Sequence, residues 1–254
     1  VSDNTEYEQM NQKAVFATPL YTEFLDTKFN IIDAPGSDDF IGGAISAFKV
    51  CETGVLVVNA QQGVEVGTEI AARFADEYKV PLILGVNQLD GEKANWEGTI
   101  EGLKEAFGSK PVIIQFPVNA GLGFDGFVDV LKMKYYHFVD DNGKREDLEI
   151  PAEYIDEAEE LRQALIEKAA EYDDSLMEKF FEVGSLTEDE IRAGLAVGIK
   201  NREVFPIMCV SAKKDIGVKR LLEFTKNVSV APQVDETQPA SLFIYQNDVE
   251  PHVG

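Results

Sequence analysis

Phe-Asn-Ile-Ile-Asp-Ala-Pro-Gly-Ser-Asp-Asp-Phe, residues 29–40, is the stretch on which the interpretation of this chain depends. A short apolar run ends at Asp33, and Pro35-Gly36 follows. This pattern predicts a buried strand that enters a loop. Asp33 then lies at the carboxyl edge of a sheet, where α/β folds bind ligands, and Gly36 lets the backbone come close to a ligand. Taken alone, the stretch also fits an ordinary turn after a strand.

The composition excludes some classes of partner. The chain has 254 residues, enough for one large or two small domains, and 44% of them are hydrophobic. Its formal net charge of −23 argues against a broad electrostatic grip on nucleic acid or on anionic lipid. The charge suits a basic protein partner, or it serves solubility alone.

The two cysteines, Cys51 and Cys209, both lie inside apolar runs. This placement predicts buried reduced thiols and a cytoplasmic protein. No apolar run approaches 18 residues, so we expect no membrane span. His137 and His252 lack acid or cysteine neighbours at ligand spacing, so no zinc site is predicted.

Strand and helix patterns alternate along most of the chain, which predicts an α/β fold with a mostly parallel sheet and helices on both faces. Residues 1–13 are polar and are expected to be exposed, and a β-hairpin with a turn at 25–27 should follow over residues 14–33. Helices are expected at 41–49, 67–78, 96–107, 125–135 and 219–226. Strands are expected at 54–59, 80–86, 112–117 and 204–210, the first of them covered on both faces.

Residues 138–200 interrupt the alternation and predict a helical insertion. Residues 140–200 hold 19 Asp and Glu against 7 Lys and Arg, a net charge of −12. Thr187 and Glu190 form a capping-box pattern, so a helix should begin near Glu188. Such acidic helices have two interpretations: a surface for a basic partner, or simply solvated faces.

Two further motifs follow predicted strands. Asn87-Gln88-Leu89-Asp90 follows the strand at 80–86, and Ser211-Ala212-Lys213 follows the strand at 204–210. A carboxylate such as Asp90 can accept hydrogen bonds from N1–H and the exocyclic amine of guanine, and adenine offers no matching donors. Alone, the first motif also fits a helix cap. The order of all three motifs, each at the end of a strand, favours a guanine nucleotide site.

The chain resembles the GTPase domain of elongation factor G, the translocation factor of the ribosome. Residues 33–40 are similar to the translational motif Asp-Thr-Pro-Gly-His-Val-Asp-Phe. A helical insertion separates the two guanine motifs, as in that family. Residues 241–254 resemble the first strand of the β-barrel domain that follows there. The resemblance divides the chain into a GTPase-like domain (1–137 and 201–230), the insertion (138–200), and a linker with that strand (231–254).

The resemblance implies ligands and partners for particular residues. Asp33 would hold Mg²⁺ through water, and the Gly36 amide would meet the terminal phosphate of GTP. The base would be bound by residues of the two guanine motifs: Asn87, Gln88, Asp90, Ser211, Ala212 and Lys213. The ribosome is the implied partner, with the flexible stalk protein as a candidate for the acidic insertion.

The sequence departs from the family at four places. No Gly-x-x-x-x-Gly-Lys-[Ser/Thr] phosphate loop occurs, so the chain is interpreted as a fragment that lacks the strand and helix around that loop and binds no nucleotide by itself. Ser37 aligns with the catalytic His, Ala14 with the Mg²⁺-binding Thr, and Gln88 with the Lys of Asn-Lys-x-Asp.

The departures at Ser37 and Ala14 predict a translation factor that binds guanine nucleotide but hydrolyses GTP weakly or not at all. The segments around Ala14 and Gly36 would order and disorder with the terminal phosphate. Two alternatives stay open. The protein is a fully active translational GTPase, or it is an acidic binding module without a nucleotide role.

Overall fold

The expected hairpin opens the folded part of the chain. The computed structural model describes residues 2–3, 5–232, 237, 239 and 241–244. Strand β1 (Thr18–Phe24) pairs antiparallel with β2 (Thr27–Asp33). Leu25 and Asp26 at the turn both have positive φ, as a two-residue turn matched to the twist of a hairpin requires. At the tip, Leu25 O accepts a hydrogen bond of 2.5 Å from Nζ of Lys226 in α8 (Val218–Val228).

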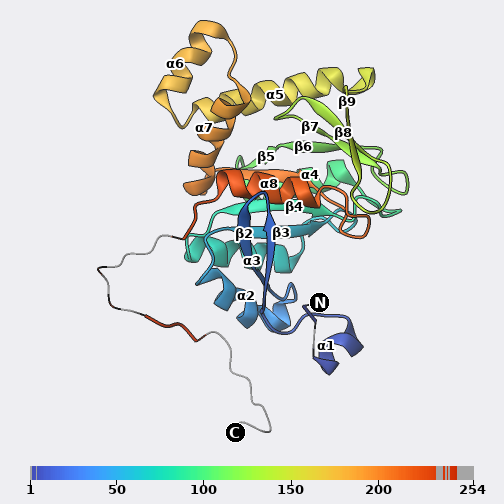
Figure 1. The fold of residues 1–254 in the computed structure, drawn as a ribbon, viewed down its shortest axis with the longest axis vertical. Helices are drawn as coiled ribbons and strands as arrows, with labels where there is room; N and C mark the ends of the chain where they lie inside the picture. Colours follow the sequence, from blue (N-terminus) through green and yellow to red (C-terminus); the bar gives the residue numbers. More distant parts are fainter. Residues whose placement is uncertain (1, 4, 233–236, 238, 240, 245–254) are drawn as a thin grey trace.

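A four-stranded parallel sheet forms the centre of the molecule. Its order is β3 (Gly54–Asn59), β4 (Leu82–Asn87), β10 (Phe205–Cys209) and β5 (Pro111–Ile113). All three pairs are parallel. Figure 1 shows α8 on one side of this sheet, with α2 (Ile41–Phe48) and α3 (Val66–Glu77) on the other. The α/β fold and these helices are therefore confirmed.

A second, antiparallel sheet replaces two elements expected in the middle of the chain. Residues 112–117 form two strands in different sheets, because the chain leaves β5 at Ile114 and enters β6 (Gln115–Val118). The helix expected at 125–135 is wrong, since β7 (Gly126–Asp129) and β8 (Lys134–Phe138) form a hairpin there. A short apolar run does not distinguish a helix from a buried strand, and here Gly126 admits the Tyr136 carbonyl of β8 where any Cβ would collide.

The inserted unit is thus a sheet with helices, not helices alone. Strand β9 (Arg145–Leu148) pairs with β8, so the division expected at 137/138 falls within a hydrogen-bonded pair of strands. Three helices follow β9: α5 (Ile155–Ala170), α6 (Asp174–Val183) and α7 (Glu188–Lys200). The predicted capping box at Thr187 and Glu190 is present. Helices α5 and α7 pack so closely that a Cβ on Gly194 would collide with the Ala169 carbonyl.

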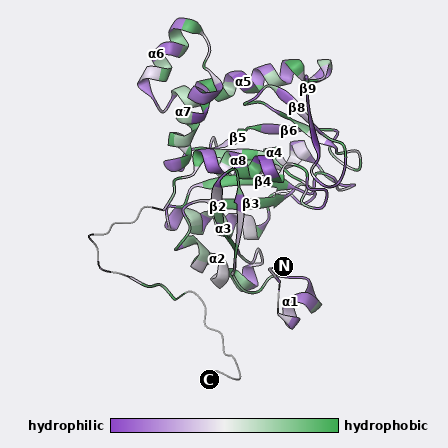
Figure 2. Ribbon diagram, in the orientation of Figure 1, coloured by the Kyte–Doolittle hydropathy of each residue, from purple (hydrophilic) through white to green (hydrophobic). Residues whose placement is uncertain are grey.

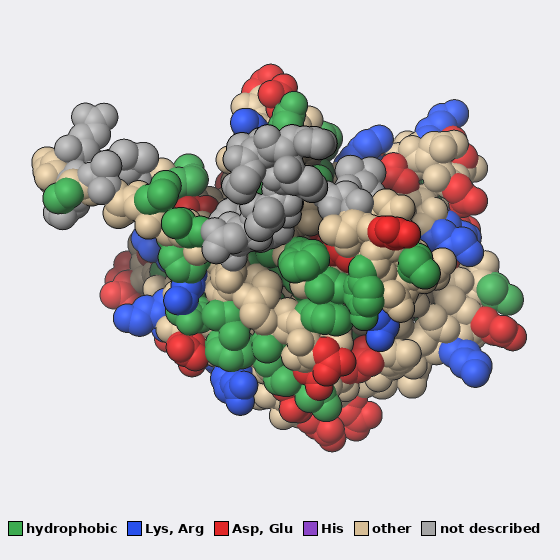
Figure 3. All heavy atoms as spheres, turned by 90° about the horizontal axis from the view of Figure 1, so that it is seen from below, with side chains coloured by type: hydrophobic (Ala, Val, Ile, Leu, Met, Phe, Trp, Pro, Cys, Tyr) green, Lys and Arg blue, Asp and Glu red, His purple; other side chains and the backbone are tan. Residues whose placement is uncertain are grey.

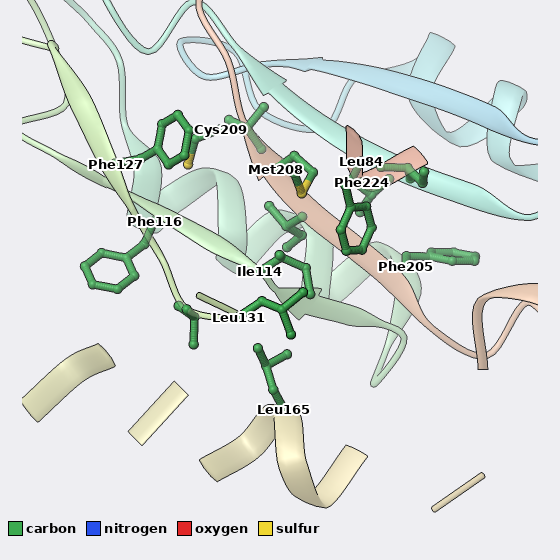
Figure 4. Close-up of a cluster of buried hydrophobic side chains, with 14 of the residues drawn as sticks. Leu84, Ile114, Phe116, Phe127, Leu131, Leu165, Phe205, Met208, Cys209 and Phe224 are labelled. Atoms are coloured by element: carbon green, nitrogen blue, oxygen red, sulfur yellow. The ribbon is translucent and has the colours of Figure 1, made fainter. Parts of the chain in front are cut away.

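One continuous core joins the two sheets to the helices. Figure 4 shows Phe127 of β7 beside Cys209 of β10, and Leu165 of α5 pointing toward Leu131. These four side chains are at most 1% exposed. In Figure 2 the central strands are predominantly hydrophobic, whereas hydrophilic residues recur along α5 and α7. The core therefore ties the insertion firmly to the parallel sheet.

Strand β3 has an uncovered side, contrary to expectation. Val55 is 41% exposed and Val57 is 59% exposed, and β3 stands at the edge of its sheet. Figure 3 shows hydrophobic side chains gathered on the face where α1 and α2 lie. Exposed apolar residues in this half of the chain include Met10 and Val66. An apolar edge strand is a site for pairing with a further strand.

The two ends of the chain differ from expectation as well. Residues 1–13 are not merely an exposed segment, because Thr5 and Glu8 form a capping box that starts α1 (Glu6–Asn11). Residues 241–244 have no regular secondary structure. The remaining residues of the expected barrel strand, 245–254, lie outside the described part of the chain, as do residues 233–236, 238 and 240 of the linker.

Candidate functional site: two strand ends and a turn

The two guanine motifs meet at the carboxyl end of the parallel sheet. Strands β4 and β10 are neighbours, with Cys209 opposite Val86, so the loops that follow them lie side by side. The Ser211 hydroxyl donates to Oδ1 of Asp90 at 2.7 Å, and the Ala212 amide donates to Oδ1 of Asn87 at 3.0 Å. The structure therefore brings together four residues that sequence analysis selected: Asn87, Asp90, Ser211 and Ala212.

The Asp90 carboxylate is oriented by Ser211. It is half-buried, and one of its oxygens is held by the buried Ser211. Its second oxygen has no hydrogen-bond partner among the described residues. A carboxylate that is oriented on one side and open on the other can accept from the two adjacent donors of guanine.

Gln88 and Lys213 lie at the outside of this site. Both are exposed, and Gln88 has a φ of 62°, which turns the chain sharply after β4. Its Oε1 accepts a hydrogen bond of 2.9 Å from Nε2 of Gln61, which follows β3. The side chain of Gln61 also packs against Gly91, where an added Cβ would meet it at 2.7 Å. Sequence analysis did not select Gln61, and no motif marks it.

The turn after β2 forms a second cluster. Asp33 is the last residue of β2, half-buried, and its carboxylate has no ion-pair or hydrogen-bond partner within the described ranges. Pro35 is buried against Gly43 of α2. The Gly36 carbonyl lies against the start of α3, where a Cβ on Gly67 would meet it at 2.6 Å. A half-buried carboxylate without a protein partner fits a magnesium ion held through water.

The two clusters remain separate in the protein. Across the described residues, no hydrogen bond or ion pair joins the Asp33 turn to Asp90 or Ser211. Asn87 and Asp90 therefore contact Ala212 and Ser211, while the role of these residues in base binding and the place of Asp33 beside a nucleotide stay predictions. No group of three or more metal-ligating side chains occurs in the described part either.

Ser37 and Ala14 have no chemistry that would replace the family residues. Ser37 stands before the short helix η1 (Asp38–Phe40), and its carbonyl accepts from the Phe40 amide at 3.0 Å. Its hydroxyl does not cap that helix. Ala14 is half-buried and carries only a methyl group. Neither side chain offers an imidazole to orient water, and Ala14 offers no oxygen for a metal.

A buried carboxylate holds the segment that contains Ala14. Oε1 of Glu8 accepts from the amides of Val15 at 3.0 Å and Phe16 at 3.2 Å. Its Oε2 accepts from the Thr5 hydroxyl at 2.7 Å and the Thr5 amide at 3.2 Å. The hydrogen bond from Val15, followed by that from Thr5, lowers the pKa of Glu8 to about 2. Glu8 thus holds this segment through the amides of Val15 and Phe16.

Comparison with known proteins identifies the family. Residues 1–230 match the elongation factor Tu GTP-binding domain. The chain belongs to this family of translational GTPases. The crystal structure of a protein from Thermus thermophilus is similar, with a TM-score of 0.83 and 26% sequence identity over 91% of this chain. This chain spans about a third of that protein, 34% of its length.

Membership has general consequences for this translation-factor GTPase domain. The family binds guanine nucleotide with Mg²⁺ and acts on the ribosome. The cluster of Asn87, Asp90, Ser211 and Ala212 between β4 and β10 is where we predict that the base binds. No helix within the described ranges has both the length and the apolar character needed to cross a bilayer.

Replacement of Glu8 by glutamine should loosen the segment around Ala14. Glutamine offers one carbonyl oxygen where the carboxylate supplies two acceptors, so the Val15 and Phe16 amides lose their charged partner. Amide hydrogen exchange at Val15 and Phe16 should accelerate in Glu8→Gln. A Glu6→Gln control should leave both rates unchanged, since Glu6 is exposed on the same helix.

The same contact predicts a dependence on pH. The pKa of Glu8 is lowered on folding from 4.5 to about 2, so its contribution is complete above pH 4.5 and is lost as the pH falls toward 2. Protection of the Val15 amide should therefore decrease over this window in the wild type and not in Glu8→Gln. Equal pH profiles in the two proteins would contradict the role of Glu8.

Proposed function

We propose that this chain is the nucleotide-binding domain of an elongation factor G-type protein that acts in ribosomal translocation and hydrolyses GTP weakly. The observation that carries the proposal is the paired contact of Asp90 with Ser211 and of Asn87 with Ala212. It provides a carboxylate for the two donors of guanine and a backbone loop for its carbonyl. A cytoplasmic location follows from action on the ribosome.

The open edge of β3 is the position at which we place the phosphate-binding strand. We propose that a strand carrying a phosphate loop pairs with β3 in the full-length protein and that a helix covers Val55 and Val57. The exposure of these two valines in an otherwise buried sheet supports this arrangement. The turn at Asp33 would then face Mg²⁺ and the terminal phosphate. This chain by itself is expected to show no measurable affinity for GTP.

Asp90→Asn should change the base that the full-length protein prefers. An asparagine amide can donate to the 2-carbonyl of xanthine, whereas it repels the 2-amine of guanine. The preference for GDP over XDP should fall by about 10⁴-fold, the scale on which unmatched buried polar groups discriminate. Equilibrium titration with fluorescent GDP, XDP and ADP measures this. Retained GDP preference in Asp90→Asn would contradict the role of Asp90, whereas no preference for GDP over ADP in the wild type would favour the nucleotide-independent binding module.

The residues at positions 37 and 14 support the proposal of weak GTP hydrolysis. Ser37 and Ala14 lack the groups that orient water and bind the metal, and Glu8 already orders the segment of Ala14. Single-turnover GTP hydrolysis by the full-length protein with ribosomes should therefore be slow. Ser37→His should raise the rate by about 10²-fold, at the lower end of the range for a positioned acid–base group because Ala14 is unchanged. Ser37→Ala should leave it unchanged.

The alternative of a fully active GTPase makes the opposite prediction. If another group orients the water, the wild type will hydrolyse GTP rapidly on the ribosome, and Ser37→His will add nothing. That result would overturn weak hydrolysis while leaving guanine binding intact.

The acidic insertion, together with the neighbouring helix α4 (Trp96–Phe107), is proposed to bind a basic segment of the ribosomal stalk protein. A groove of about 550 Å³ runs between α4 and α5. Trp96 and Ile100 form its apolar floor, both under 10% exposed. The carboxylates at its rim are Glu97, Glu101, Glu105 and Glu157, against one cation, Lys104. Burial, together with the charges of Glu97 and Glu160, raises the pKa of Glu157. A cation in the groove would therefore stabilise the ionised carboxylate of Glu157.

Charge reversal in the groove should weaken that contact. The double variant Glu101→Lys/Glu105→Lys should bind purified stalk protein about tenfold more weakly, with the loss reduced at high salt. The double variant Glu69→Lys/Glu77→Lys changes the net charge equally on exposed positions of α3 and should bind as the wild type does. Calorimetric titration at two salt concentrations measures both. Equal weakening by the two variants would indicate net charge alone and not this groove.

A further inference from the structure

The parallel sheet has a break beside the guanine site. Strand β5 pairs with β10 only as far as Ile113 opposite Ile207, and the Ile114 amide donates to Ile207 O at 3.1 Å. The chain then turns away into β6. The Cys209 amide, on the β5 side of β10, therefore faces a position where no further β5 residue continues the ladder. A buried amide without an acceptor costs free energy comparable to a lost hydrogen bond.

The side chain of Gln115 supplies the acceptor that a continued β5 would have provided. Its Oε1 accepts from the Cys209 amide at 3.0 Å, and its Nε2 donates to Oδ2 of Asp129 at 3.1 Å. Both side chains are 0% exposed. The bond to Asp129 orients the amide group, so that the oxygen of Gln115, not its nitrogen, faces Cys209.

Asp129 is in turn fixed by a buried cation. Nε of Arg220 lies 2.7 Å from Oδ2 of Asp129, and its Nη2 lies 3.4 Å from Oδ1. Oδ1 also accepts from the Lys132 amide at 3.0 Å. Arg220 is only 2% exposed, and its outer side meets Glu223 at 3.5 Å. The charges of this network are thus paired and its hydrogen bonds satisfied, which a buried ion pair needs in order to persist.

This network holds both ends of the loop that carries Ser211 and Ala212. Cys209 is the last residue of β10, two residues before Ser211, and Arg220 lies in the first turn of α8, which follows the loop. One buried pair, Gln115 and Asp129, contacts both. A third contact, from Nζ of Lys214 to Phe124 O at 3.2 Å, ties the middle of the loop to the inserted sheet.

We propose that Gln115, acting with Asp129 and Arg220, is a positioning residue for guanine recognition. It fixes the direction in which β10 ends, and thereby the Ser211 hydroxyl that orients Asp90 and the Ala212 amide beside Asn87. The inference rests on the proposed guanine site. It adds that the inserted sheet, through β6 and β7, sets the geometry of the base-reading loop.

The test compares two ligands that differ only at the group this loop would meet. GDP and 6-thio-GDP share the ring, the N1–H and the 2-amine, and the second replaces the base carbonyl oxygen by a weakly accepting sulfur. Gln115→Met keeps the length and volume of the side chain and removes the acceptor. In the full-length protein, Gln115→Met should lower the preference for GDP over 6-thio-GDP roughly threefold to tenfold.

A matched variant separates positioning from general loss of stability. Phe116→Leu alters the next residue of β6, which is 2% exposed and packs against Tyr154, and it leaves Cys209 untouched. It should lower stability and keep the wild-type ratio of the two affinities. Where Gln115→Met does not fold, Arg220→Lys keeps the charge opposite Asp129 but not its two-pronged contact, and the same fall in the ratio is expected.

Amide exchange gives a readout that needs no nucleotide. In this chain, the amides of residues 209–213 should exchange faster in Gln115→Met than in Phe116→Leu. An unchanged ratio of GDP to 6-thio-GDP affinity in a folded Gln115 or Arg220 variant would overturn the proposal, whatever the exchange rates. A wild type that does not prefer GDP to ADP would instead overturn the guanine site itself, so the two failures can be told apart.

Discussion

The parallel pairing of β4 with β10 is the constraint on which the site depends. In a parallel sheet, neighbouring strands end at the same edge. The residues that follow each strand therefore lie close together, whatever the lengths of the loops. The register that sets Cys209 opposite Val86 then places Ser211 beside Asp90. A shift of one residue would turn the side chains of β10 to the opposite face. The contacts of Ser211 with Asp90 and of Ala212 with Asn87 are therefore a consequence of strand register, and whatever fixes β10 also fixes them.

Much of what fixes β10 comes from outside the parallel sheet. On one side it has the full strand β4, but on the other β5 ends early and a side chain completes the hydrogen bonding. Phe127 and Leu131 of the inserted unit share the core with Cys209 (Figure 4). The insertion is for this reason more than an appended surface. Its sheet is part of the support of the loop that carries Ser211 and Ala212.

The sequence predicted the parts of the protein whose chemistry is local. Asp33, Asn87 and Ser211 follow apolar runs that contain enough β-branched residues to form strands, and the structure places each at or just after a strand end. The capping box of Thr187 and Glu190 likewise depends on only four consecutive residues. The similar pattern of Thr5 and Glu8 was available in the sequence and would have predicted α1.

Other features depend on contacts between residues far apart in the chain, and no local pattern contains them. The apolar run near Val128 fits a helix or a strand, and it becomes a strand because Gly126 lets β8 approach. Gln115 gives no sign in the sequence that its side chain will accept a hydrogen bond from a backbone amide 94 residues away. The apolar run at 54–59 predicted burial of Val55 and Val57, because such a run reports what a strand can bury and not which neighbouring strand and helix are present.

Glu8 bears on how a switch could work in this protein. In a switch driven by nucleotide, the segment must gain order only when the terminal phosphate and its metal are bound, so that the free energy of binding is coupled to the conformation. Here the residue aligned with the metal-binding threonine is Ala14, and the adjoining amides of Val15 and Phe16 are already occupied by a carboxylate of the same chain. We propose that the Glu8 contacts, together with the lack of a metal-binding oxygen at Ala14, weaken the coupling between nucleotide and conformation. A partner that binds this segment would then meet it whether or not GTP is present.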